Sequence, residues 1–430
     1  MSPLSDALFE VARSLFPEVE LSPRARFSPM FELEKGEISS TAAIELARAT
    51  RGDAIQIAQR IIDQLAPRFH GAWKVVAGYI VLSDASAGIL TPEAHDIESL
   101  FSDSARGPVR TVIVLTPDSV TPLYARLRVL ASGALHAALI AAFEGRCRVG
   151  FEPAEAQEVT SVSQVVSLFR AAVERSISSE REIRRVGVAR QIMADSSEGE
   201  ITAWTSHHFH EKLPREVRKF FSDVRREGRI SLRMPPDGWL LSRDRALSEI
   251  LSPERIARVV RRLESEELWK RWMMHMASAT PSGDIDPSVA LYDECASPRW
   301  SARALDERLR ALVPDAYALS ASDTILKIGD FLLLDREMAL RALFLPRLTA
   351  RAVREGEVLG WMGTVERFIA RGHALLNSPH VRVSLTKSPL SRDNVQIIAS
   401  LLFGIASILP VVTEDVCGSR RRSSNQQVPF

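Results

Sequence analysis

The stretch that decides the fold reads Val109-Arg-Thr-Val-Ile-Val-Leu115, then an apolar run over residues 127–143, then Cys147-Arg-Val-Gly-Phe151. The first and last segments are short, apolar and rich in β-branched residues, which predicts two buried strands. The run between them is long enough for a helix, and Thr116-Pro-Asp-Ser119 closes the first strand. A strand, a helix and a second strand in this order predict a βαβ unit in a parallel sheet covered by helices.

Upstream of this unit, the sequence has the pattern of a small α+β domain. Apolar residues recur at helical spacing over residues 41–65, and Arg51-Gly-Asp53 interrupts them. We therefore expect two amphipathic helices, with the glycine ending the first and the aspartate capping the second. Residues 73–82 are β-branched and aromatic, which predicts one strand with a bulge or a close backbone approach at Gly78.

Composition places the chain among ordinary globular proteins. Its 430 residues are 46% hydrophobic and 25% charged, which predicts a substantial core and two or three domains. The 55 Lys and Arg nearly balance the 54 Asp and Glu, so the sequence has no overall basic field of the kind that attracts nucleic acid. Three widely spaced cysteines exclude a disulfide framework, and the N-terminus lacks the pattern of a secretion signal, so we expect a cytoplasmic protein.

Two stretches depart from this average. Over residues 212–233 there are eight cations and three carboxylates with aromatic residues between them, which is typical of an RNA-facing surface or of a solvated helix face. Over residues 395–412 almost every side chain is apolar. Because that length is short for a membrane span and includes Gly404 and Pro410, the pattern favours a buried core helix over a tail anchor.

Segments at both ends of the chain resemble one family, the arginyl-tRNA synthetases. Those that resemble the family's N-terminal additional domain are residues 34–48, 57–65 and 75–83, with Gly36-Glu37 and Ala77-Gly-Tyr-Ile80 at its motif positions. Those that resemble its all-helical, DALR-type anticodon-binding domain are residues 338–343, 348–358, 368–383 and 391–409. The resemblance is one of fold, and it also explains an apolar run near the C-terminus without a membrane.

The adenylating signature of that family, SPNPxKPLHVGHLRSxxxGDAL, follows the first strand of a Rossmann-like sheet. Here the same place reads Thr116-Pro-Asp-Ser-Val-Thr-Pro-Leu-Tyr-Ala-Arg-Leu-Arg128, with Gly133-Ala-Leu135 beyond it. Tyr124 stands at the first signature histidine, Arg126 reaches the second only after a one-residue deletion, and Ala125 replaces the glycine. In that family the imidazoles hydrogen-bond ATP phosphates, and losing such a donor costs on the order of 10²–10³ in rate. The resemblance therefore implies a protein that has lost adenylation.

Other motifs are weaker. The second signature of these enzymes, KMSKS, has no convincing match, since Thr386-Lys-Ser-Pro389 lies within the C-terminal helical part, and no GxSxG, Walker or GxGxxG motif occurs. His207-His-Phe-His210 lacks the HExxH order, so no metal site is predicted. Cys147 and His136 could act as nucleophile and base, but a small core residue and an ordinary helix residue are the commoner roles.

The expected fold is α/β with a large α-helical part. It comprises a small α+β N-terminal domain (residues 1–103) and a reduced Rossmann-like middle domain with helical insertions (108–325). A C-terminal helical bundle (330–417) and a disordered tail (418–430) follow.

The resemblance implies a degenerate paralogue of arginyl-tRNA synthetase that binds tRNA, charged tRNA included, in a regulatory or biosynthetic role. Two alternatives stay open. One is an enzyme with a remodelled pocket that uses aminoacyl-tRNA or ATP for aminoacyl transfer or amide-bond formation in small-molecule biosynthesis. The other is a non-catalytic dimerisation or scaffold subunit.

The candidate site residues follow from the resemblance. The catalytic candidates in the remnant signature are Tyr124, Arg126 and Arg128. The degenerate nucleotide loop comprises Pro117, Asp118, Pro122 and Gly133. The candidate tRNA contacts are Arg215, Arg218, Lys219, Arg225, Arg226, Arg347, Arg351 and Arg392. ATP is the one possible cofactor. The chain could form a homodimer or bind a partner enzyme, and neither DNA nor a membrane is expected as a partner.

Overall fold

A computed structural model describes residues 3–22, 25–29, 38–83, 109–115, 123–151, 156–178, 201–205, 230–235, 252–278, 288, 291, 302–313, 336–388, 397–398, 401–402, 404–405 and 408. Within these residues the apolar side chains form two separate cores. The smaller lies between Leu4 and Leu82, and the larger runs from Val112 to Ile408. The predicted domain boundaries and the predicted disordered tail lie outside the described residues.

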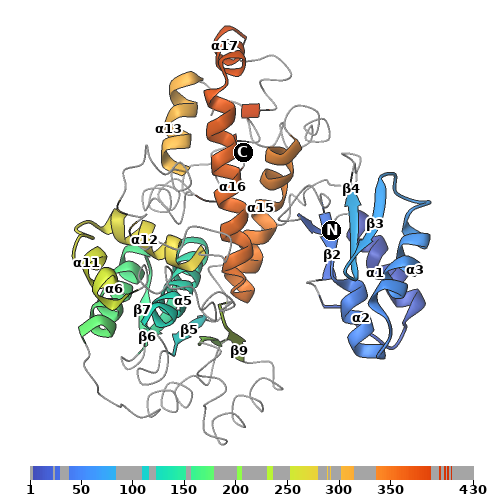
Figure 1. Cartoon of the computed structure of the whole chain (residues 1–430), viewed down its shortest axis with the longest axis horizontal. Helices are drawn as coiled ribbons and strands as arrows, with labels where there is room; N and C mark the ends of the chain where they lie inside the picture. The colour runs from blue at the N-terminus through green and yellow to red at the C-terminus, as the bar shows by residue number, and fades with distance from the viewer. Residues whose placement is uncertain are drawn as a thin grey trace, which may run out of the picture.

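The smaller core belongs to an N-terminal α+β domain, drawn in blue in Figure 1. Its elements are α1 (Pro3–Leu15), β1 (Ser28–Pro29), β2 (Ile38–Ser40), α2 (Ala42–Thr50), α3 (Ala54–Leu65), β3 (Ala72–Val76) and β4 (Tyr79–Ser83). The strands form an antiparallel sheet in the order β1-β2-β4-β3. Ile57, Ile61 and Leu65 recur at helical spacing and give α3 the buried face that packs against this sheet.

The break between α2 and α3 falls where the sequence predicted it. Asp53 caps α3, because its carboxylate accepts a hydrogen bond from the Ile55 N–H at 2.8 Å. The prediction that Gly52 ends α2 is wrong in detail. Arg51 adopts the left-handed conformation, with φ at 55°, and its N–H bonds to the Ala47 carbonyl.

Residues 73–82 lie in a hairpin instead of the single strand that we expected. β3 and β4 pair antiparallel along their whole length, and Ala77 and Gly78 form the turn with φ of 50° and 84°. Two successive residues with positive φ have the twist that suits a two-residue hairpin. The predicted close approach at Gly78 is confirmed, because a Cβ there would lie 2.9 Å from the Ala54 Cβ.

Replacing Gly78 with alanine is expected to destabilise the N-terminal domain by about 1–3 kcal/mol, because its φ is strained for an L residue and its Cβ would press on Ala54. Gly360→Ala is a control of opposite sign, since a Cβ at Gly360 meets nothing within 4 Å and alanine favours a helix. Urea unfolding followed by tryptophan fluorescence measures both. An unchanged midpoint for Gly78→Ala would contradict the strained turn.

The βαβ unit predicted from the sequence is confirmed in the middle of the chain. The elements of this part are β5 (Thr111–Val114), α5 (Leu123–Glu144), β6 (Cys147–Phe151), β7 (Gln157–Val159), α6 (Val162–Ser178), β8 (Ile201–Trp204) and β9 (Ile230–Arg233). They form a sheet in the order β7-β6-β5-β8-β9, parallel throughout except for β7. After residue 161 the described elements are helices, apart from β8 and β9, which extend the parallel sheet.

Helices cover this sheet and continue beyond it (Figure 1). The remaining helices are α11 (Pro253–Val260), α12 (Glu266–Ser278), α13 (Ala302–Leu312), α15 (Arg336–Glu355), α16 (Val358–Asn377) and α17 (Pro379–Lys387). The larger core is continuous from the sheet into α15 and α16, so the parts predicted as middle and C-terminal domains share it. Phe344 of α15 also packs against the smaller core, and α15 therefore contacts all three parts.

Two apolar segments bear on the membrane question. Within the described residues, α5 is the one helix long and apolar enough to span a bilayer, and 94% of its most apolar window is buried inside the protein. In the run 395–412, Ile398 and Leu401 are buried in the larger core, and a Cβ at Gly404 would overlap the Phe368 ring. These residues pack as the core-helix interpretation expects.

Candidate functional site

The carboxyl edge of the parallel strands is the first candidate site. β6 and β8 flank β5 on opposite sides, so the connections after β5 and β8 diverge at that edge. Such a divergence is where open α/β sheets bind ligands. The ladder extends one residue past the strands, because the Leu115 N–H donates to the Trp204 carbonyl at 2.8 Å and the Thr205 N–H donates to the Arg233 carbonyl at 3.0 Å.

Gly133 fixes how α5 lies over this sheet. A Cβ at Gly133 would lie 2.3 Å from Cγ2 of Val114 and 3.5 Å from the Trp204 indole, so the bare backbone of α5 sits directly on β5 and β8. A helix that connects two parallel strands returns antiparallel to them. At 1.5 Å per residue, Arg128 and Tyr124 therefore lie about 8 Å and about 14 Å further along the helix axis, toward the carboxyl edge.

The side chains at this edge are polar and mostly cationic. Tyr124 and Arg128 are buried on α5, and Arg126 is half-buried beside them. Thr205 is fully buried, and within the described residues its hydroxyl has no hydrogen-bond partner. Arg233 is half-buried at the end of β9. Guanidinium groups held in place by packing suit a phosphate or a carboxylate, and a buried hydroxyl adds a neutral donor.

The other predicted site residues are placed only in part. Those outside the described residues are Pro117, Asp118, Pro122, Arg215, Arg218, Lys219, Arg225, Arg226 and Arg392. Arg347 lies in α15, and Arg351 of the same helix forms an ion pair with Glu357. The structure therefore brings Tyr124, Arg126 and Arg128 together with the sheet edge, and the roles assigned to the site residues stay predictions.

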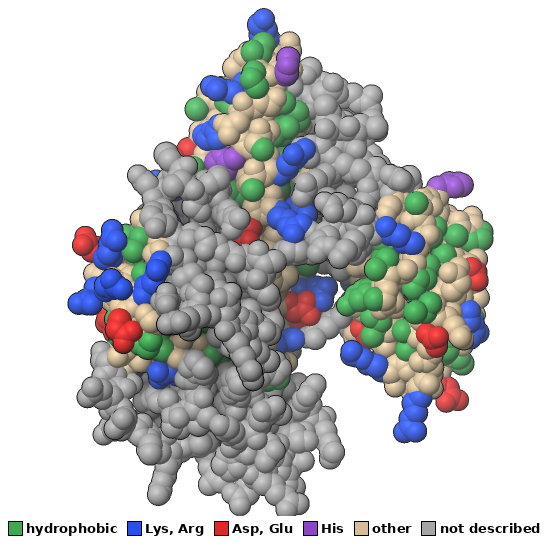
Figure 2. All heavy atoms as spheres, in the orientation of Figure 1, with side chains coloured by type: hydrophobic (Ala, Val, Ile, Leu, Met, Phe, Trp, Pro, Cys, Tyr) green, Lys and Arg blue, Asp and Glu red, His purple; other side chains and the backbone are tan. Residues whose placement is uncertain are grey.

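A second candidate is the cationic end of the bundle, which we define as residues 367–388 of α16 and α17. This segment contains Arg367, Arg371, Arg382 and Lys387 and no Asp or Glu. Arg382 and Lys387 are exposed on α17. Figure 2 shows blue Lys and Arg side chains at the end of the molecule that α17 forms. Sequence reasoning missed this surface because its charge density is modest, yet the absence of carboxylates over the segment was visible in the sequence.

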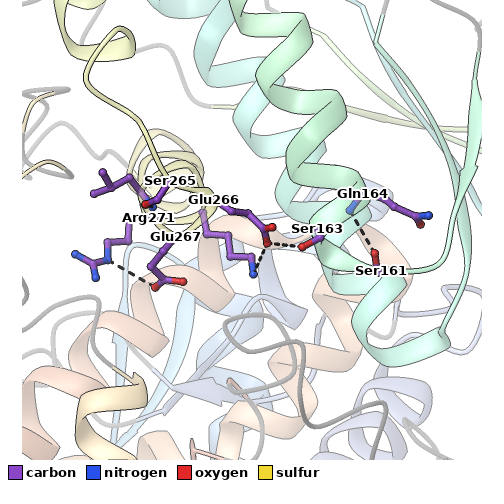
Figure 3. A network of polar contacts seen from close by, with 9 residues as sticks. Ser161, Ser163, Gln164, Ser265, Glu266, Glu267 and Arg271 are labelled. Carbon is purple, nitrogen blue, oxygen red and sulfur yellow. Dashed lines mark hydrogen bonds and ion pairs between the residues drawn. The ribbon is translucent and has the colours of Figure 1, made fainter.

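A third constellation joins the first turns of α6 and α12 (Figure 3). Glu266 accepts a hydrogen bond from the Ser163 hydroxyl and forms an ion pair with Lys270, whose Nζ lies 2.7 Å from the Glu266 Oε1. Although partial burial acts to raise the pKa of Glu266, the bonds from Lys270 and Ser163 outweigh it and the pKa is lowered. A carboxylate that stays ionised and doubly bonded is a poor base. We interpret this group as a staple between two helices.

Cys147 and His136 are buried core residues, the roles that the sequence favoured over a nucleophile and its base. Burial, followed by the charges of Glu144 and Glu158, raises the pKa of the Cys147 thiol to about 12, and its sulfur contacts the Ala137 carbonyl at 3.5 Å. A thiol with that pKa holds almost no thiolate at neutral pH. His136 is occupied elsewhere, between the indole of Trp204 and the backbone of α15.

No metal site emerges from the parts of the chain that the structure describes, where no group of three or more His, Cys, Asp or Glu comes together. The segment His207-His-Phe-His210 lies outside these parts.

Neither a protein-family model nor a curated protein matches the chain. Among solved structures, it is similar to the arginyl-tRNA synthetase of Thermus thermophilus, with a TM-score of 0.43 and 13% sequence identity over 95% of this chain and 98% of that chain. A likeness at this level does not establish a shared function.

Proposed function

We propose that this chain is an arginyl-tRNA-synthetase-like protein that binds tRNA, charged tRNA included, in a regulatory or biosynthetic role, and that it does not adenylate an amino acid. The observation that carries the proposal is the cationic end of the bundle, which contains four Lys and Arg residues and exposes Arg382 and Lys387 on α17. Exposed cations of this kind attract a phosphate backbone. The order of sequence segments that resemble the synthetase modules supports RNA over another polyanion.

The carboxyl edge of the sheet supports the second half of the proposal. Tyr124 and Ala125 occupy positions where the resembled signature has a histidine and a glycine, and both are buried in the helix. A buried tyrosine and a Cβ cannot reproduce the phosphate donors and the open backbone that adenylation uses in that family.

Binding is tested by titrating the full chain with a tRNA transcript and with duplex DNA of equal phosphate number, between about 50 and 200 mM salt. We expect tighter binding to tRNA at every salt concentration and a steep loss of affinity as salt rises. Equal affinity for the two nucleic acids at moderate salt would overturn the proposal.

Neutralising α17 should weaken tRNA binding. The double variant Arg382→Gln, Lys387→Gln removes two exposed cations, so the slope of log K against log salt should become shallower by about 1.4–1.8. Arg258→Gln with Arg262→Gln removes two exposed cations from α11 and from the turn that follows it, and serves as the matched control, because α11 lies at the left of Figure 1, away from α17 at the top. If both double variants change the slope equally, α17 is not a specific contact surface.

An enzyme is the second candidate function, and the buried Tyr124, Arg128 and Thr205 at the sheet edge favour it. There the arginines would hold an anionic group, and Tyr124 would serve as an acid or base in aminoacyl transfer or amide-bond formation. ATP–pyrophosphate exchange and consumption of charged tRNA are the two assays. No activity in either assay would reject the enzyme and leave tRNA binding as the only proposed function.

A further inference from the structure

A chain of two buried hydrogen bonds joins the sheet to the C-terminal helices. The Trp204 indole Nε1 lies 3.3 Å from Nδ1 of His136, and Nε2 of His136 lies 3.0 Å from the Val353 carbonyl oxygen. An indole N–H can only donate, so Nδ1 must accept. The imidazole proton is therefore on Nε2 and is donated to Val353. This contact chain fixes both the tautomer and the neutral state of His136.

The same turn of α15 is held by one further hydrogen bond, and the residue that follows the helix lies close to the His136 ring. Arg110 donates from Nη1 to the Arg354 carbonyl at 2.9 Å and is itself paired with Glu144 at 3.1 Å. Gly356 follows with φ at 69°, and a Cβ there would lie 3.3 Å from the His136 ring. The last carbonyls of a helix lack intrahelical partners. Here Arg110, which precedes β5, and His136, which lies on α5, donate to two of these carbonyls. These bonds tie the end of α15 to the sheet.

This joint lies between the two candidate binding surfaces. Trp204 directly precedes Thr205 at the carboxyl edge, and the Arg233 side chain lies 3.5 Å from a Cβ built on Gly356. On the other side, α16 leaves the Gly356 turn and leads into α17. The angle at which α16 leaves the joint therefore determines where the cationic end of the bundle stands relative to the carboxyl edge.

We propose that Trp204, His136 and Val353 form a clasp that fixes the orientation of α15 and α16 on the sheet and thereby couples the cationic end of the bundle to the carboxyl edge. His136 is a positioning residue in this arrangement. The part that concerns RNA rests on the proposed function. One tRNA that contacts both surfaces would lose affinity if the clasp opened, because the second contact would no longer be made at a high effective concentration.

Two variants separate the hydrogen bonds from the space that the ring fills. His136→Gln keeps one acceptor and one donor on a neutral side chain, whereas His136→Leu removes both. We expect hydrogen exchange of the amides at residues 352–358 to quicken at least tenfold in His136→Leu and to stay within threefold of wild type in His136→Gln. Trp269→Phe is the matched control. It deletes another buried indole bond, to the Leu263 carbonyl at 2.8 Å, and should leave residues 352–358 unchanged.

Binding of the tRNA transcript by the same variants tests the coupling. Affinity should fall tenfold or more for His136→Leu, with a shallower salt dependence, and should be close to wild type for His136→Gln. Unchanged exchange at residues 352–358 in His136→Leu would overturn the clasp, and altered exchange with unchanged affinity would overturn the coupling. If His136→Leu does not fold, Trp204→Phe removes only the indole donor and takes its place. If the wild type binds no tRNA, the proposed function fails, and the exchange data still decide the clasp.

Discussion

Replacing Gly133 with alanine should destabilise the chain by about 1–3 kcal/mol, although alanine favours a helix by up to about 1 kcal/mol over glycine. The added Cβ would lie 2.3 Å from the Val114 methyl, and the Trp204 ring stands 3.5 Å away on the next strand. Neither neighbour can withdraw easily, because both are buried in the sheet beneath α5. Urea unfolding of the full chain measures the loss.

A double-mutant cycle shows whether the overlap is the cause. Val114→Ala removes the methyl that the new Cβ would meet, and alone it should cost about 1–2 kcal/mol as a small cavity. Together, Gly133→Ala and Val114→Ala should cost less than the sum of the two single changes by about 1 kcal/mol or more. Strict additivity would mean that the overlap between the new Cβ and Val114 is not the cause of the loss.

Local signals were sufficient for much of the fold. The runs 109–115 and 147–151 with an apolar helix between them predicted the parallel pair, and Asp53 predicted a helix start. The errors come from places where tertiary contacts decide. Arg51 takes the left-handed conformation in preference to the adjacent glycine, and β8 and β9 are strands of only four residues, too short to stand out in the sequence without their partners in the sheet.

The sequence predicted where the candidate site lies better than it predicted which side chains contact one another there. A parallel βαβ unit directs attention to the residues after β5, and Tyr124 and Arg128 do lie toward that edge. The partners of His136 could not be found from sequence, because Trp204 and Val353 are 68 and 217 residues away. Only the folded arrangement shows that a residue with the chemistry of a base is used to join two parts of the chain.

The free energy of unfolding should fall as the pH is lowered, because His136 takes up a proton more readily in the unfolded chain than in the folded one. Burial, only partly opposed by the Val353 carbonyl and reinforced by the charges of Arg110 and Arg233, lowers the pKa of His136 from 6.5 to about 4. The unfolded chain therefore takes up this proton at a higher pH than the folded chain. Stability from this residue is fully present above pH 6.5, is lost as the pH falls to about 4, and amounts to about 3 kcal/mol in total.

The comparison with His136→Gln isolates this effect from the other histidines. Both proteins share every other titrating group, so the difference in their free energies of unfolding should be flat above pH 7 and should shift by about 2 kcal/mol between pH 6.5 and pH 5, with the wild type losing more. Glu266 also has a lowered pKa, but its contribution is lost only at lower pH, below the pKa of an unfolded glutamate. Parallel curves for the two proteins from pH 7 to 5 would mean that His136 accepts a proton without opening the joint. Because a protonated imidazole would face the Trp204 indole donor with a second donor, we expect the curves to diverge and exchange at residues 352–358 to quicken over the same pH range.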